Sequence, residues 1–133
     1  MVTVSIAGSG NPIQVNWSQG MNVQQAMEEA YATNPSGFVY ALQYFGEYGY
    51  LAIMFNQTFE TLIPTESPYY YWELFVNGSP SQNGIDATIL NDTDVVTFEL
   101  TLYIPSLHAN TLLGKKAQDE IVFIFNGLKS GEL

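Results

Sequence analysis

A group of aromatic side chains around one predicted hairpin turn offers the most specific binding chemistry in the chain. Aromatic rings with polar tips suit planar ligands and sugars, because the ring face makes apolar contact while the hydroxyl forms hydrogen bonds. The candidate ligand-binding residues are Tyr44, Phe45, Tyr48, Gly49, Tyr50 and Trp72. The alternative is that most of these rings belong to the core or to an ordinary surface, and the sequence leaves both interpretations open.

The remaining polar residues do not indicate a catalytic site, and we expect a protein that is not an enzyme. His108, the single histidine, has no nucleophile motif nearby, so we expect a solvent-exposed linker residue rather than a general base. Asp92 and Asp94 are weak candidates for binding a hard cation. Their spacing lacks the glycine and the distal glutamate of a calcium loop, so a capped acidic turn explains them better. These residues predict no metal and no cofactor.

Charge is distributed unevenly along the 133 residues. Residues 1–104 contain ten acidic residues and no Lys or Arg, whereas residues 105–133 hold three lysines and three acidic residues. Nucleic acid and anionic membranes are therefore poor partners, because phosphate groups are bound by clustered cations. No apolar run reaches transmembrane length, and the N-terminal residues lack the pattern of a signal peptide. The absence of cysteine excludes disulfides and thiolate chemistry.

Four Asn-x-Ser/Thr sequences are candidate glycosylation sites. They begin at Asn16, Asn56, Asn77 and Asn91. The Asn, Ser and Thr content predicts about 1.4 such sequences by chance. The excess favours an extracellular or cell-surface glycoprotein, although a cytoplasmic location stays open.

Hydrophobic periodicity predicts the elements that position these residues. Residues 2–6 and 13–17 alternate between apolar and polar side chains, which indicates two strands joined by a glycine-rich turn. One convincing helix follows, capped by Asn22 with Gln25 placed for a capping box. Its apolar stripe consists of Val23, Ala26, Met27, Ala30 and Tyr31.

Four further stretches predict strands. Residues 38–45 and 50–55 indicate a hairpin, residues 71–76 alternate with period two before an Asn-Gly turn, and residues 95–104 continue the sheet. One helix laid across a mixed sheet in this strand–strand–helix–strands order is a β-grasp arrangement. The predicted fold class is therefore α+β, with one short helix and an extra C-terminal strand.

Short motifs spread over most of the chain carry a family resemblance. They are Asn34-Pro35-Ser36-Gly37-Phe38, Tyr48-Gly49-Tyr50 leading to Ile53 and Asn56, Tyr71-Trp72-Glu73-Leu74, Asn77-Gly78 with Pro80, Gly84, and the acidic turn before Val95-Val96. Together they resemble the C-terminal domain of the vitamin B12 carriers transcobalamin and intrinsic factor. Similar small modules of the DUF4430 type occur in bacterial and archaeal surface proteins. The resemblance covers roughly residues 12–103 and implies a β-grasp domain over residues 1–104.

The resemblance also implies a ligand. In those carriers the β-hairpin of this domain covers one face of the corrinoid, and a separate helical domain covers the other. Tyr48 and Gly49 match the positions of the aromatic–glycine pair of that hairpin. Two departures weaken the match: no helical domain accompanies these residues, and Gln57 stands where the family usually places a glycine after Asn56.

Residues 105–133 extend past the family pattern. We expect a linker followed by an association strand that is apolar on both faces and needs a partner. This strand consists of Ile121, Val122, Phe123, Ile124 and Phe125. By strand complementation it would pair with a sheet edge of its own domain or of a neighbouring copy, and the second case gives a homo-oligomer.

Two functions follow from these patterns. The first is a non-catalytic cell-surface module that acts in protein association, including self-assembly into a filament or surface layer. The alternative is capture of a small, corrinoid-like molecule by the aromatic hairpin, with the rest of the enclosure supplied by a partner.

Overall fold

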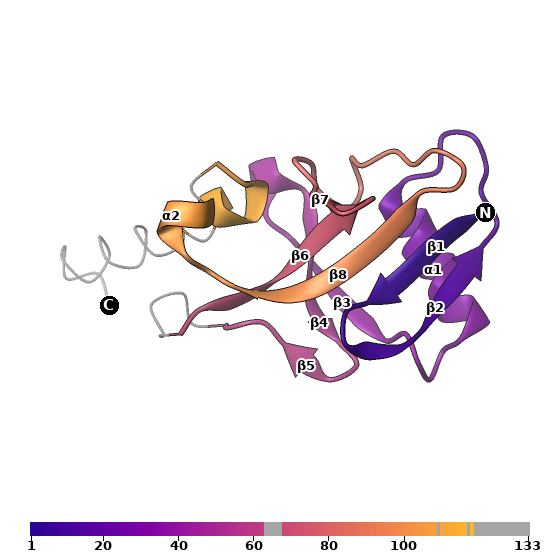
Figure 1. The fold of residues 1–133 in the computed structure, drawn as a ribbon, viewed down its shortest axis with the longest axis horizontal. Helices are drawn as coiled ribbons and strands as arrows, with labels where there is room; N and C mark the ends of the chain where they lie inside the picture. Colours follow the sequence, from indigo (N-terminus) through magenta and orange to yellow (C-terminus); the bar gives the residue numbers. More distant parts are fainter. Residues whose placement is uncertain (63–67, 109, 117, 119–133) are drawn as a thin grey trace.

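The computed structural model describes residues 1–62, 68–108, 110–116 and 118, and arranges them as two sheets and a main helix around one core (Figure 1). The first sheet has the order β2-β1-β8-β6-β7, and the second has the order β3-β4-β5. The first sheet comprises β1 (Val2–Ile6), β2 (Ser9–Val15), β6 (Tyr70–Val76), β7 (Ser79–Pro80) and β8 (Val95–Leu102). The second comprises β3 (Tyr40–Tyr44), β4 (Tyr50–Phe55) and β5 (Thr58–Phe59), and the main helix is α1 (Val23–Thr33).

The pairing of the first sheet is mixed, as the predicted β-grasp fold requires. Strand β1 runs parallel to β8, with Val4 beside Val96, while β1–β2 and β6–β8 are antiparallel. Two parallel strands need a long crossover connection, and the elements between β1 and β8 in the sequence form it. The α+β, β-grasp-like fold is therefore confirmed for the described residues.

Helix α1 begins where the sequence predicts. The side chain of Asn22 accepts a hydrogen bond from the Gln25 backbone N–H at 2.8 Å, and the Gln25 side chain accepts one from the Asn22 N–H at 2.9 Å. Four members of the predicted stripe are buried: Val23, Ala26, Met27 and Ala30. Tyr31 is 48 % exposed because it lies at the edge of the stripe, where its ring packs edge-on against Tyr40.

Strands β6 and β8 divide the sheet into an inner and an outer face. Trp72 and Leu74 of β6 and Phe98 of β8 point into the main core, where Phe55 of β4 packs against the rings of Trp72 and Phe98. The intervening residues, such as Glu73, lie on the outer face. Apolar burial on the inner face supplies most of the free energy that holds the two sheets together.

The chain departs from the predicted strand and linker after Leu102. Strand β8 ends there, before the predicted end at residue 104, and Ile104 is exposed. Residues expected to form a linker are helical instead, as α2 (Pro105–His108) and again over residues 112–116. Proline favours the first turn of a helix, which explains the start of α2. The predicted strand at 121–125 lies outside the described residues and stays a prediction.

None of the described helices is long and apolar enough to span a membrane.

In the turn between β4 and β5, Gln57 adopts a backbone conformation that is unfavourable for its residue type. Asn56 and Gln57 have φ values of 46° and 72°, the left-handed pair of a tight hairpin turn. Asparagine tolerates this conformation, whereas glutamine is strained in it and glycine is not. The missing family glycine therefore has a conformational cost.

Replacing Gln57→Gly should raise the free energy of unfolding by up to about 1 kcal/mol, because glycine adopts positive φ without a Cβ clash. Urea unfolding checks this, with Gln57→Ala as the control that keeps the Cβ. A glycine variant no more stable than the alanine variant would contradict the assignment of strain to this turn.

Candidate functional site

The candidate ligand site lies at the turn of the β3–β4 hairpin, where the short 3₁₀ helix η1 (Gly46–Tyr48) joins the strands. A pocket of about 220 Å³ opens between this turn and the loop at 82–87. Tyr44, Tyr48 and Gly49 line it from the hairpin, Asp86 lines it from the loop, and Leu112 lines it from the C-terminal extension.

The aromatic residues of the hairpin separate into two sets. Tyr44 and Tyr50 face each other across the strands, are 61 % and 39 % exposed, and have ring centroids 5.2 Å apart. Phe45 and Tyr48 are half-buried and pack against a second apolar cluster that contains Leu51. The hairpin therefore presents one pair of rings outward and uses the other pair to hold itself to the domain.

Trp72 does not join this group, contrary to the predicted cluster. Its side chain is buried in the main core, packs on Phe55 with centroids 5.0 Å apart, and donates a hydrogen bond to the Thr58 carbonyl at 3.0 Å. Trp72 lies on the same face of β6 as Leu74, and the packing of the sheets makes this the inner face. Trp72 has no free ring face for a ligand.

Glycine positions let the loop lie directly against the hairpin. Gly49 has φ of 73°, and a Cβ there would lie 2.7 Å from Oδ1 of Asp86. That same carboxylate oxygen accepts a hydrogen bond from the Tyr50 N–H at 2.9 Å. A Cβ on Gly84 would lie only 2.5 Å from the Tyr48 carbonyl oxygen. Such close backbone approach explains why side chains are excluded at both positions.

The loop is in turn tied to the start of helix α1. The Asn22 side-chain amide donates to the Asp86 carbonyl at 3.1 Å, and the Val23 N–H donates to the Thr88 carbonyl at 3.0 Å. The Ile85 N–H donates to the Tyr50 carbonyl at 2.8 Å. These hydrogen bonds connect the helix, the loop and the hairpin in one chain of contacts.

The extension packs against the back of the hairpin. Leu113 is buried with Tyr71 and Leu51, and Leu112 packs beside Phe45 and Tyr48 in the same cluster. This second apolar core joins residues beyond β8 to the hairpin, so the extension supports the candidate site as well as lining its pocket.

A buried ion pair completes this contact. Nζ of Lys116 lies 3.2 Å from Oε2 of Glu60, and the two side chains are only 2 % and 5 % exposed. The same ammonium lies 4.0 Å from the centroid of the Phe45 ring, which is the geometry of a cation–π interaction. Neither residue was predicted from the sequence to form this pair. The one pattern that pointed toward it is that every lysine lies within residues 105–133 of an otherwise acidic chain.

His108 is half-buried rather than solvent-exposed, which corrects the linker prediction. Its Nδ1 accepts a hydrogen bond from the Ile104 N–H at 2.9 Å, and its ring stacks on Tyr103 with an angle of 27° between the planes. These contacts make it a capping residue of the α2 turn.

Asp94 stabilises the acidic turn predicted from the sequence by accepting hydrogen bonds within it. Its Oδ1 accepts from the Asn77 side-chain amide and its Oδ2 accepts from the Asn91 N–H, each at 2.8 Å. Asp92 is exposed and pairs with the amino group of Met1. Both carboxylate oxygens of Asp94 are therefore used in holding the turn.

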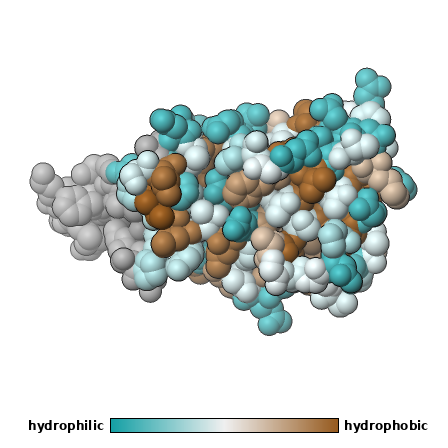
Figure 2. Space-filling view, in the orientation of Figure 1, coloured by the Kyte–Doolittle hydropathy of each residue, from teal (hydrophilic) through white to brown (hydrophobic). Residues whose placement is uncertain are grey.

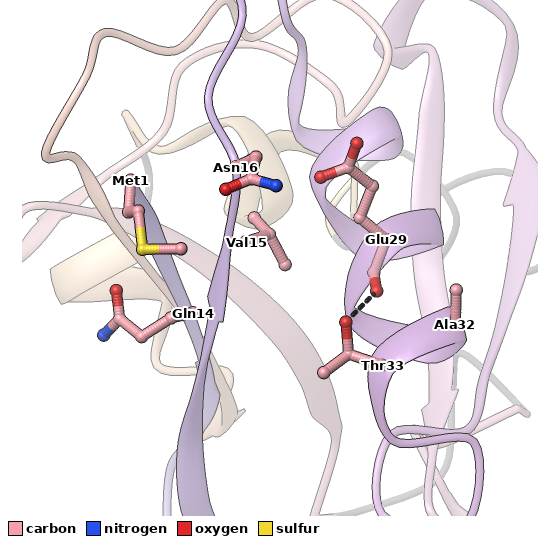
Figure 3. Close-up of a pocket in the computed structure, with 7 residues that line it drawn as sticks. All are labelled: Met1, Gln14, Val15, Asn16, Glu29, Ala32 and Thr33. Atoms are coloured by element: carbon pink, nitrogen blue, oxygen red, sulfur yellow. Dashed lines mark hydrogen bonds between the residues drawn. The ribbon is translucent and has the colours of Figure 1, made fainter.

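The four candidate glycosylation sites differ in how their side chains are used. Asn56 accepts from the Val39 N–H and donates to the Gly37 carbonyl, and Asn77 joins the acidic turn. Asn16 and Asn91 are exposed. Figure 3 shows Asn16 at the end of β2, across a shallow pocket of about 240 Å³ from Glu29 of α1.

Comparison with protein families identifies the module. The family model described as a domain of unknown function, DUF4430, matches residues 20–101, more than half of the chain. The chain belongs to the DUF4430 family. The matched region contains the hairpin and the loop at 82–87, whereas the helical turn that carries Leu112 and Lys116 lies beyond it.

Solved structures share the fold of this DUF4430 module. Haptocorrin in complex with Cbi superposes with a TM-score of 0.68 at 17 % identity, over 77 % of this chain and 25 % of that chain. A candidate metal-binding protein from Ruminococcus gnavus ATCC 29149 superposes with a TM-score of 0.56 at 17 % identity, over 77 % of this chain and 95 % of that chain. No curated protein sequence matches the chain. The expected resemblance to the transcobalamin-like domain is confirmed, and this chain spans a quarter of the length of haptocorrin.

Replacing Lys116→Met should lower the free energy of unfolding by about 3 kcal/mol, because Glu60 would lose the ammonium beside it and remain buried. Lys115→Met is the matched control, since the neighbouring Lys115 is exposed and should tolerate the change within about 0.5 kcal/mol. Urea unfolding measures both. Equal stability of the two variants would show that the buried pair does not hold the extension.

Proposed function

We propose that the chain is a non-catalytic binding module whose hairpin turn forms one wall of a site for a flat, corrinoid-like ligand. The observation that carries the proposal is the exposed pair Tyr44 and Tyr50 on a hairpin that Asp86 holds in place. When a ligand covers large apolar rings that are exposed to water, the removal of apolar surface from water makes the free energy of binding more favourable. Their hydroxyls supply polar contacts at the rim of the same surface.

Pre-organisation of the hairpin supports this proposal. The Phe45 N–H donates to the Gly49 carbonyl at 2.9 Å, the Asp86 carboxylate accepts from Tyr50, and Phe45 is packed under Lys116. A surface that is already ordered loses little conformational entropy on binding. The ring pair is thus presented on a rigid support.

The size of the pocket indicates that the site is shared. Its volume of about 220 Å³ is below the usual range for enclosed ligand sites, roughly 300–1,000 Å³. A corrinoid-sized ligand on this surface needs a second wall, which another domain or chain would provide. The shared fold with haptocorrin in complex with Cbi supports this arrangement by analogy.

The polar groups of the pocket support binding rather than catalysis. The Asp86 carboxylate at the pocket already accepts a backbone hydrogen bond and lies against Gly49, which leaves it a structural role. We propose that the module lies outside the cell, because the chain has an excess of Asn-x-Ser/Thr sequences and those at Asn16 and Asn91 have exposed asparagines that a glycan could reach. Self-assembly through residues 121–125 concerns a segment outside the described residues and stays a prediction.

Even without the second wall, the module should bind cobalamin weakly, and Tyr44→Ala should weaken that binding at least about tenfold through loss of one ring face. Equilibrium dialysis with the absorbance of the corrinoid is the suitable measurement, since Trp17 and Trp72 lie in or against the core and would report poorly. Tyr31→Ala is the control, because Tyr31 is a similarly exposed tyrosine on helix α1. An absence of binding at saturating cobalamin, or equal weakening by both variants, would refute the proposal.

A further inference from the structure

A groove of about 490 Å³ crosses the outer face of the first sheet, where β6 and β8 approach α2. Its walls are mainly apolar, and three of the residues that form them, Leu102, Ile104 and Leu107, are exposed to solvent. Strand β8 and α2 face the viewer in Figure 1, and Figure 2 shows hydrophobic side chains gathered over α2 and beside the adjoining part of the sheet. The groove is larger than the hairpin pocket and is lined by different residues.

Two carboxylates lie in the groove. Glu73 of β6 and Glu99 of β8 are directly opposite each other in the antiparallel register, and both line the groove. Like charges at directly opposed positions destabilise a sheet. Glu73 is only 4 % exposed, and its pKa is raised by burial and, to a smaller extent, by Glu99. Hydrogen bonding from Thr101 opposes that rise.

The described residues that line the groove include no lysine or arginine to balance these carboxylates. Among the described residues that line the groove, His108 is the one side chain that could carry a positive charge, and its proximity lowers the pKa of Glu73 against the larger effect of burial. Its Nδ1 accepts a hydrogen bond from the Ile104 N–H. Lys116 is engaged with Glu60, and residues 1–114 contain no Lys or Arg. The groove combines apolar walls with two opposed carboxylates and no lysine or arginine.

We propose that this groove binds a small amphipathic amine, a protonated amino group carried on an apolar stem. The ammonium would lie between Glu73 and Glu99 and relieve the repulsion between them. The stem would cover the exposed side chains of Leu102 and Leu107. The volume of about 490 Å³ lies within the range of small-molecule sites. This inference does not depend on the function proposed for the hairpin.

Octylammonium, titrated below its micelle concentration and followed by amide chemical shifts of the full chain, tests the proposal. Saturable shifts should appear in β6, β8 and residues 103–108. Binding should weaken at least about tenfold in Glu73→Gln, which keeps the shape of the side chain and removes its charge. Glu28→Gln, a change at an exposed glutamate of α1, should leave the affinity unchanged. Octanol, with the same stem and no charge, should bind at least about tenfold more weakly.

The inference would be overturned by the absence of saturable shifts in these strands, by equal binding of octanol and octylammonium, or by unchanged affinity in both Glu73→Gln and Glu99→Gln. Shifts confined to residues 44–50 would also contradict it, because they would place the amine at the hairpin. A failure of cobalamin to bind the hairpin would leave the groove result unaffected.

Discussion

The contact between Lys116 and Glu60 is the interaction on which the arrangement of this chain depends. A lysine ammonium is expensive to remove from water, and it stays buried only where an opposite charge and suitable partners compensate. Here Glu60 supplies the charge and the Phe45 ring supplies its face. The pair therefore connects three segments: the helical turn at 112–116, the residue following β5, and the base of the hairpin. In this pair, a lysine from the C-terminal part of the chain neutralises a buried carboxylate in residues 1–104, which contain no Lys or Arg.

The described residues form two apolar cores. The main core lies between the sheets, and the second, around Leu51, Tyr71 and Leu113, lies between the hairpin and the extension. Hydrogen bonds from the start of α1 through the loop at 84–88 reach the hairpin from its other side. The DUF4430 match ends at residue 101, so the extension that supports the hairpin and forms one pocket wall lies outside the matched region. The proposed binding function would benefit from this support, because an ordered surface loses little conformational entropy on binding.

Local signals in the sequence predicted much of the fold, and long-range packing accounts for what they missed. The capping box at Asn22 and the acidic turn at Asp94 are local interactions, and both form as predicted. The alternation in β6 indicates two faces but not which face is inner, because both carry aromatic residues. The sequence therefore leaves Trp72 open as a ligand-site candidate, whereas the structure places it in the core. Burial of Lys116 could not be predicted, since lysine is almost never fully buried and its partner is 56 residues away.

Hydrogen exchange of the hairpin amides tests most directly whether the buried pair holds the site together. The amides to follow are those of Phe45 and Tyr50, with amides of β1 as the internal reference for global opening. In Lys116→Met the hairpin amides should exchange at least about tenfold faster relative to β1, whereas Lys115→Met should leave that ratio unchanged. An unchanged ratio in Lys116→Met would show that the hairpin is ordered without the extension and would contradict this account.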